Sequence, residues 1–406
     1  MQVDRAGRLH LTYCTNIHPG QGWQAVAASL ARYAPALKKR FSPADPFGIG
    51  LRLSALDARE LLDGHLDEFR EFLEREGLYV AIINGFPFGS FHGGTVKADV
   101  YAPDWRENAR VHYTLDLIQI LSRILPTGLD GGISTAPLSY KPWMQDAGEE
   151  DWQRVTANVV RVAEALVRLR LTAGTFIHLD IEPEPDCAIE NTDEVLAFFE
   201  QWLLPYGAPR LAGAIGISVE EARQALLDHV RICFDCCHFA VEFEDPLVAL
   251  ERLSRAGIQI GRVQLSSAIH VDLAGDGPAR ASAVDRLRQF ADPVYLHQVI
   301  ARERGTLTHF PDLADALQHS PSNSPPSSSD TQWRVHFHVP LFAREYDGLA
   351  STQDYVRTVI RAARAHPFTS HLEIETYTWD VLPADLKIDL LESIGREYDW
   401  VLSVLR

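Results

Sequence analysis

Short apolar segments alternate with longer amphipathic segments from one end of the chain to the other. The short segments predict strands over residues 9–16, 49–54, 79–85, 132–137, 175–182, 230–235, 261–266, 333–339 and 371–376. Between them, apolar residues recur at helical spacing, most clearly over residues 59–76 and 151–170. Strands that alternate with helices are usually parallel and joined by crossovers, so the pattern predicts an α/β fold.

A single (β/α)8 TIM barrel fits the length of 406 residues, since such barrels need about 250 residues and accept long insertions. A closed barrel has eight strands, one fewer than the pattern predicts. We therefore expect an insertion before the last strand, within residues 261–339, and a hairpin of residues 295–302 and 306–310 could form part of it. Residues 320–330 are rich in Pro and Ser and predict a flexible loop inside a single domain of residues 1–406.

The later strands carry polar side chains at every second position. These positions are His178, Asp180 and Glu182; Cys233 and Asp235; Gln264 and Ser266; His336 and His338; and Glu373 and Glu375. Parallel strands covered by helices are usually apolar throughout, so we expect the polar face to point to the barrel axis. Buried carboxylates destabilise a fold unless they are paired or bound to a cation, and one divalent cation at the barrel mouth would satisfy several of them.

Two alternatives explain the same alternation. An antiparallel sheet with one solvated face also has polar residues at every second position. An internal ion-pair network without metal is the other alternative, and His178, Arg231 and Arg334 are its candidate partners.

Four motifs resemble the xylose isomerase-like sugar-phosphate isomerase/epimerase superfamily. They are DIEPEPD around Glu182, FDCCH with Asp235 and His238, VHFHVPL with His336 and His338, and EIETYTW with Glu375. Four longer segments, LTYCTNIHPG, QLSSAI, HFHVPLF and ETYTWDVLP, look like the EboE metabolite traffic proteins, and that likeness covers nearly the whole chain.

The resemblance implies a TIM barrel with a divalent cation, Mn²⁺, Mg²⁺ or Zn²⁺, and a small polyol, sugar or cyclitol-like substrate. Glu182 and Glu375 match the two metal ligands that also pass the substrate proton. Asp235 matches the second metal ligand, and His238 matches the histidine that faces the substrate.

The third metal ligand depends on which segment forms strand seven of the barrel. If residues 261–266 form it, Gln264 takes the ligand position; if residues 333–339 form it, His338 does. An imidazole binds divalent cations better than an amide, which favours His338.

Other residues are candidates for the walls of a pocket, because barrel active sites are built from strand ends and the loops that follow them. They are Asn16, His18 and Trp23 after the first strand, Phe86, Phe88 and Phe91 in the run NGFPFGSFHGG, and Lys141 and Trp143 after the fourth strand. An ordinary packed turn is the alternative for NGFPFGSFHGG. Cys233, Cys236, Cys237 and His238 lack a second Cys/His pair at zinc-finger spacing, so we expect Cys233 in the core and the other two cysteines in a loop.

The net charge of −17, from 38 Lys and Arg against 55 Asp and Glu, opposes binding to nucleic acid. No signal peptide or membrane span is visible, and five cysteines do not form a secreted disulfide framework, so we expect a cytoplasmic protein.

Three functions remain. The first is a metal-dependent isomerase or epimerase, within a pathway for metabolite biosynthesis or export. The second is a non-catalytic metabolite traffic protein that acts with other proteins of the pathway. The third is a metal-dependent hydrolase like endonuclease IV, which the charge disfavours.

Overall fold

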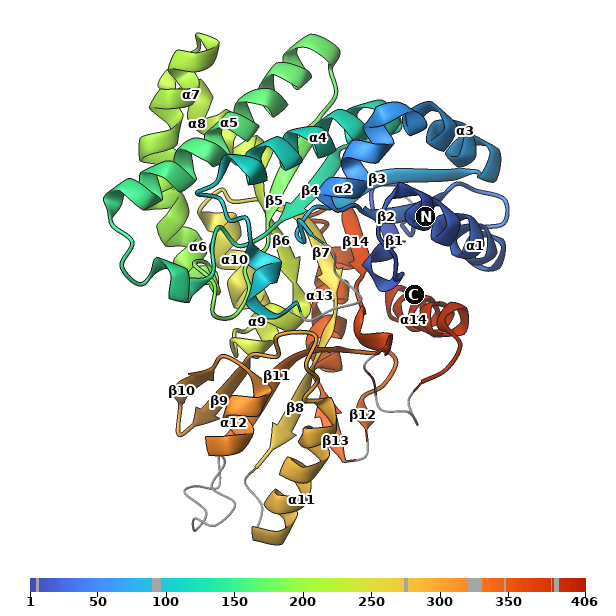
Figure 1. The fold of residues 1–406 in the computed structure, drawn as a ribbon, viewed down its shortest axis with the longest axis vertical. Coiled ribbons are helices and arrows are strands. Elements are labelled where there is room, and N and C mark those ends of the chain that lie inside the picture. Colours follow the sequence, from blue (N-terminus) through green and yellow to red (C-terminus); the bar gives the residue numbers. More distant parts are fainter. Residues whose placement is uncertain are drawn as a thin grey trace.

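A computed structural model describes residues 1–4, 7–89, 96–273, 277–319, 331–346, 348–380, 382 and 387–406. Eight parallel strands form a barrel surrounded by helices (Figure 1). The strand order is β1-β14-β7-β6-β5-β4-β3-β2, and a parallel bridge between Cys14 and Gly50 closes the ring between β1 and β2. The (β/α)8 barrel predicted from the sequence is therefore confirmed.

The barrel strands agree with the predicted segments to within a few residues. They are β1 (His10–Tyr13), β2 (Phe47–Arg52), β3 (Leu78–Asn84), β4 (Gly131–Thr135), β5 (Ile177–Ile181), β6 (Val230–Asp235), β7 (Ile260–Leu265) and β14 (His371–Ile374). The register places Gln264 on β7 between Asp235 on β6 and Glu373 on β14. Polar residues from consecutive strands are thus neighbours at the same height of the barrel.

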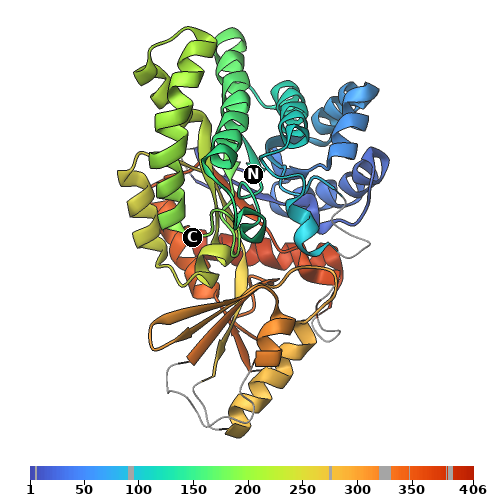
Figure 2. The same ribbon diagram turned by 60° about the vertical axis from the view of Figure 1, so that its left-hand side comes forward.

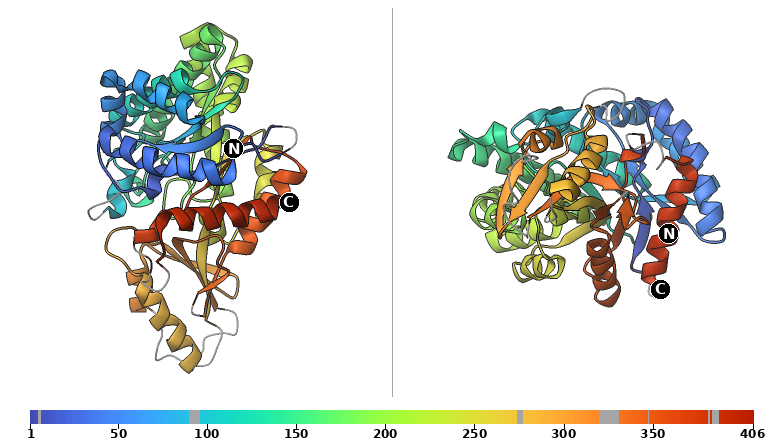
Figure 3. Two further views of the ribbon diagram at one scale, coloured as in Figure 1. Left: turned by 90° about the vertical axis from the view of Figure 1, so that its right-hand side faces the viewer. Right: turned by 90° about the horizontal axis from the view of Figure 1, so that it is seen from below.

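The helices follow the strands in the expected alternation. They are α1 (Trp23–Phe41), α2 (Ala55–Glu60), α3 (Leu66–Glu76), α4 (Asn108–Ile124), α5 (Glu149–Ala173), α6 (Thr192–Phe198), α7 (Ala208–Ile215), α8 (Val219–His229), α9 (Cys236–Val241), α10 (Pro246–Arg255), α11 (Gly277–Leu287), α12 (Leu313–His319), α13 (Gln353–Ala365) and α14 (Leu390–Leu405). The last helix, α14, lies at the side of the barrel next to α1 and α13 (Figure 3). Among the described helices, none is both long and apolar enough to cross a membrane.

A second sheet is inserted between β7 and β14 and extends from the carboxyl ends of the barrel strands (Figures 1 and 2). Its strands are β8 (Ser267–Asp272), β9 (Val299–Glu303), β10 (Thr306–Phe310), β11 (Thr331–Val339), β12 (Glu345–Tyr346) and β13 (Leu349–Ser351). They are antiparallel in the order β10-β9-β11-β8-β13-β12, and α11 and α12 lie on one face. This confirms the predicted insertion before the last strand.

The inserted sheet also corrects one expectation. Residues 333–339 belong to β11 of the antiparallel sheet, so their polar face does not line the barrel axis. Period-2 alternation arises in a half-covered antiparallel strand as well as in a barrel strand, and the pattern alone does not separate them. The predicted hairpin is β9 and β10, which pair through Thr306 and Glu303 at the turn. The predicted flexible loop of residues 320–330 lies outside the described residues.

An ion-pair network fills the barrel interior below the strand ends. The buried guanidinium of Arg262 on β7 donates to Asp180 Oδ2 at 3.2 Å and to Glu373 Oε2 at 3.2 Å. Gly261 and Gly50 make room for these carboxylates, since a Cβ atom at either position would lie within 2 Å of a carboxylate oxygen. A metal-free network is therefore present one layer deeper than the strand ends, with Arg262 as its central cation. Of the partners expected for it, His178 contacts Asp180, whereas Arg231 pairs with Asp130 and Arg334 donates to the Ala240 backbone oxygen.

Candidate active site

A cavity opens at the carboxyl end of the barrel, where the barrel loops meet the inserted sheet. Its empty volume is about 530 Å³, part of it open to solvent. Glu182 and Glu375 line it from the barrel, and Tyr295 and His338 line it from the insertion. The site is therefore shared between the barrel and the inserted sheet.

Four oxygen-bearing side chains form a carboxylate cluster at the carboxyl ends of the barrel strands: Glu182 after β5, Asp235 at the end of β6, Gln264 on β7 and Glu375 after β14. Of these, Glu182 and Glu375 line the cavity. One atom of the Gln264 amide lies 2.8 Å from Glu182 Oε1 and 3.2 Å from Asp235 Oδ2. If that atom is nitrogen, the amide donates to both carboxylates; if it is oxygen, three oxygens converge. The strand order also makes β7 strand seven, so Gln264 occupies the strand-seven position and His338 does not.

Asp235 is held in place from two sides. Its Oδ1 accepts the backbone N–H of His238 at 3.0 Å, which makes Asp235 the N-cap of α9. The same oxygen accepts the hydroxyl of Ser266 at 2.7 Å. Cys236 and Cys237 consequently begin a helix, which corrects the loop expected for them, while Cys233 is in the core as predicted.

Glu375 is held by residues from both parts of the protein. The Asn16 side-chain amide donates to Glu375 Oε1 at 2.6 Å. The ring of His338 reaches the same residue from β11: its Nδ1 lies 2.7 Å from the Glu375 backbone oxygen and 3.0 Å from Oε2. His338 is thus brought to the carboxylate cluster by the insertion.

The carboxylate cluster is short of positive charge. Burial raises the pKa of Glu182 well above its ordinary value, and the charges of Glu375 and Asp235 raise it further. Burial also raises the pKa of Glu375, although His338 opposes that shift. A divalent cation would offset this repulsion, and carboxylate and amide oxygens are suitable ligands for it.

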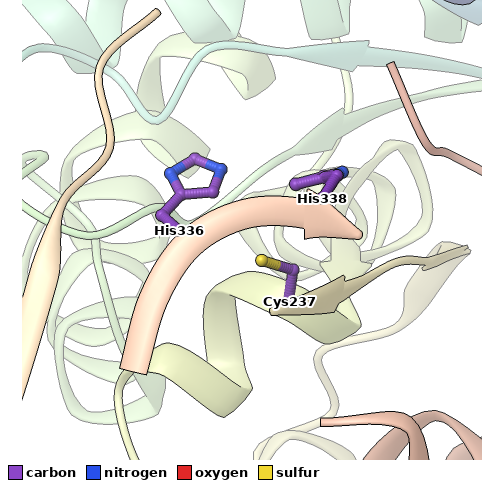
Figure 4. Close-up of side chains that lie close together, drawn as sticks. All are labelled: Cys237, His336 and His338. Atoms are coloured by element: carbon purple, nitrogen blue, oxygen red, sulfur yellow. The ribbon is translucent and has the colours of Figure 1, made fainter. Parts of the chain in front are cut away.

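A second group in the cavity consists of histidines around Glu184. Figure 4 shows His336 and His338, two positions apart on β11, with Cys237 of α9 beside them. His238 Nε2 lies 3.1 Å from His336 Nε2. Burial lowers the pKa of His238 to about 4 and lowers that of His336 as well, so both rings are neutral at pH 7.

Glu184 is buried beside these rings. Its Oε1 accepts the hydroxyl of Tyr101 at 2.7 Å and lies 3.5 Å from His336 Nδ1. Burial raises the pKa of Glu184 to about 8. Sequence reasoning gave Glu184 no role, although it lies in the quoted DIEPEPD motif, two residues after Glu182.

The other pocket candidates divide into two groups. Asn16 and Phe86 line the cavity, and Phe91 lies outside the described residues. The rest have partners elsewhere: His18 stacks on Tyr33, Trp23 packs against Phe69, Phe88 packs against Tyr113, Lys141 pairs with Glu190, and Trp143 packs against Tyr140.

Comparison with known proteins gives structural similarity only. No protein-family model matches the sequence, and no curated protein matches it. One similar structure is a xylose isomerase-like TIM barrel protein from Mycobacterium smegmatis in complex with magnesium, with a TM-score of 0.52 and 13% identity over 98% of this chain and 97% of that chain. Two further structures are the IOLI protein with a binding zinc atom (TM-score 0.48, 11% identity, 98% and 99% covered) and the probable 3-DHS dehydratase AsbF from Bacillus anthracis (TM-score 0.45, 11% identity, 98% and 97% covered). The first of these shows the fold of this chain.

Proposed function

We propose that this xylose isomerase-like TIM barrel is a divalent-cation-dependent isomerase or epimerase that acts on a small polyol, sugar or cyclitol-type ketone. The observation that carries the proposal is the carboxylate cluster, in which Glu182 and Glu375 line one cavity and Asp235 and Gln264 lie between their strands. The EboE likeness adds a pathway for metabolite biosynthesis or export as the setting.

The residues of the cluster fit a hard divalent cation such as Mn²⁺ or Mg²⁺. Glu182, Asp235, Gln264 and Glu375 would hold it, and the strand order favours Gln264 over His338 as the third ligand. Reversing the Gln264 amide places its nitrogen 2.8 Å from Glu182 Oε1 and 3.2 Å from Asp235 Oδ2, where it donates to both carboxylates; with a cation bound, the amide oxygen would take that position and serve as a ligand. The magnesium complex of the Mycobacterium smegmatis protein, which has the same fold, is in line with this choice of cation. The cation would polarise the substrate carbonyl when bound.

Glu182 and Glu375 would carry the proton. One carboxylate removes the proton from the carbon next to the carbonyl, and the other returns a proton to the product, so the reaction needs no oxidant or reductant. Asn16 and His338 fix the carboxylate of Glu375 for this role. The resemblance gives His238 a substrate hydroxyl to hold, and its position in the cavity wall is compatible with that.

The cavity favours a small substrate with polar and apolar faces. Its volume of about 530 Å³ lies within the usual range of small-molecule sites, about 300–1,000 Å³. Phe86 and Tyr377 line it with aromatic rings, against which the C–H face of a sugar ring would pack. Asn84, with its amide, supplies a partner for a hydroxyl group.

The test is exchange of a carbon-bound proton with solvent. The protein is incubated in deuterium oxide with a panel of ketoses and cyclitol ketones, with and without Mn²⁺, and incorporation is followed by mass spectrometry. We expect Mn²⁺-dependent incorporation into at least one compound. Glu375→Gln should lower it by about 10² or more, as for a lost general base, while Glu68→Gln on the surface should leave it unchanged.

A well-folded protein that neither binds Mn²⁺ nor exchanges any compound of the panel would contradict the proposal. That result would favour the non-catalytic metabolite traffic protein, since a carrier needs neither a cation nor a proton-transfer pair.

A further inference from the structure

Three buried side chains outside the carboxylate cluster meet where the inserted sheet joins the barrel. His238 comes from α9, His336 from β11, and Glu184 from the segment after β5. One ligand atom from each residue lies within 4.8 Å of those from the other two. All three side chains line the cavity.

The protonated nitrogen of His238 is fixed by its partner. His238 Nδ1 lies 2.8 Å from the backbone oxygen of Pro183. A carbonyl oxygen only accepts, so Nδ1 carries the ring proton. In the neutral ring, Nε2 therefore has a lone pair.

The protonated nitrogen of His336 is fixed in the same way, here by the side chain of Gln298. His336 Nδ1 lies 2.7 Å from Gln298 Oε1. The Gln298 amide is not reversible, because its Nε2 lies 3.0 Å from the Pro185 backbone oxygen, which only accepts. His336 Nδ1 is therefore the donor, and His336 Nε2 also has a lone pair.

The two Nε2 atoms lie 3.1 Å apart, so two lone pairs face each other. Such an arrangement needs a positive charge between the rings, either a cation or a shared proton. Two nitrogen ligands on a tetrahedral Zn²⁺, with Zn–N distances of about 2.0–2.1 Å, lie about 3.3 Å apart. Histidine ligands also commonly donate their other N–H to a carbonyl or carboxylate oxygen, as Pro183 and Gln298 allow here.

We infer that His238, His336 and Glu184 form a second divalent-cation site, of the Zn²⁺ type, beside the carboxylate cluster. Tyr101 and Gln298 both donate to Glu184 Oε1, which fixes the carboxylate beside the two rings. Two histidines and a glutamate form a known catalytic zinc ligand set, which leaves a position open for a substrate or water oxygen. For His238, this assignment replaces the substrate-hydroxyl role.

This second site uses residues other than the carboxylate cluster, so it can be right or wrong independently of the proposed isomerase activity. The probe is Co²⁺, which replaces Zn²⁺ and absorbs visible light in nitrogen-containing sites of low coordination number. We expect chelator-treated wild-type protein to bind two Co²⁺ ions and to show this band.

Variants separate the two sites. His336→Gln should lose one bound Co²⁺ ion together with the visible band, whereas Glu375→Gln should keep the band. His112→Gln, at an exposed position, is the matched control and should bind as wild type. Gln298→Met keeps all three ligands and removes the Nδ1 acceptor, so it should weaken Co²⁺ binding at this site by about 10–100-fold.

Two results would overturn the inference. One is that His336→Gln, with an unchanged Tm, binds as many Co²⁺ ions as wild type. The other is that ¹⁵N spectra of zinc-saturated protein show one proton shared between the two rings.

Discussion

Arg262 and Glu373 form an ion pair inside the barrel, with 3.2 Å between Nη1 and Oε2 and both side chains fully buried. Arg262 also contacts Asp180 at 3.2 Å, so one guanidinium compensates two carboxylates. A buried charge that loses its partner destabilises the fold far more than an exposed one.

We therefore predict that Arg262→Leu lowers the free energy of unfolding by about 3–5 kcal/mol, because Asp180 and Glu373 lose their cation. Arg255→Leu is the control, since Arg255 pairs with Glu251 at the surface, where their side chains are 75% and 59% exposed. That variant should change stability by less than about 1 kcal/mol. Urea denaturation followed by circular dichroism measures both, and equal effects would contradict the assigned role of Arg262.

Adding a single methyl group at Gly50 should strongly destabilise the folded protein. A Cβ atom there would lie 1.8 Å from Glu373 Oε1, so Gly50→Ala must displace this carboxylate from the network of Arg262. We expect poor folding or a loss of several kcal/mol. In Gly213→Ala on α7, the new methyl group meets no atom within 4 Å and should stabilise the helix by roughly 0.5–1 kcal/mol. Thermal unfolding of the two variants is the measurement, and a Tm of Gly50→Ala near that of wild type would refute the prediction.

Ser266 should affect the affinity for a cation because its side chain holds Asp235 in place. Its hydroxyl donates to Asp235 Oδ1 at 2.7 Å and accepts the backbone N–H of Cys237 at 2.9 Å. Ser266→Ala removes this support, and we expect Mn²⁺ binding at the proposed site to weaken by about 10-fold or more. Calorimetric titration measures the Kd, Ser122→Ala on the surface is the control, and restored affinity in Ser266→Thr would separate positioning from misfolding.

The buried Glu397 on α14 should make the stability of the protein depend on pH. Burial raises its pKa from 4.5 to about 8, although the hydroxyl of Thr376 and the N–H of Leu341 donate to it. Between these two pH values the folded chain binds a proton that the unfolded chain has released. The contribution to stability is therefore full below pH 4.5 and is lost as the pH rises through about 8.

Glu397→Gln removes this titration and keeps the shape of the side chain. Between pH 5 and pH 8, the Tm of wild type should consequently fall more than that of the variant. Parallel pH slopes for the two proteins would show that Glu397 does not carry the effect.

The barrel was predictable because its signal is repeated along the chain. Each strand and helix adds to the alternation, and errors at single boundaries do not change the topology. The convergence of Glu182, Asp235 and Glu375 was predictable from the polar residues at every second strand position. These three residues come at the carboxyl ends of their strands, and parallel barrel strands bring those ends to one face.

The inserted sheet limited the prediction of the site. His336 and His338 have the period expected of a barrel strand, but β11 pairs with β8 and β9, contacts that no local pattern specifies. Arg262 has the same alternation as Gln264 but lies earlier on β7, below the strand ends where a barrel active site is expected, so the sequence did not mark it as a site residue. The EboE likeness and the cytoplasmic compartment stay predictions.

The pairing of β1 with β14 has a consequence for protein synthesis. These are the first and last strands of the barrel, joined from His10–His371 to Tyr13–Ile374. On the ribosome, the neighbouring strands β2 to β7 and the whole inserted sheet are made before β14, so the ring closes only after residues 371–374 have been translated. Glu375 follows β14 directly and meets Asn16 only after closure. The histidines of the insertion are therefore synthesised before Glu375, and a chain terminated before that residue lacks a complete carboxylate cluster.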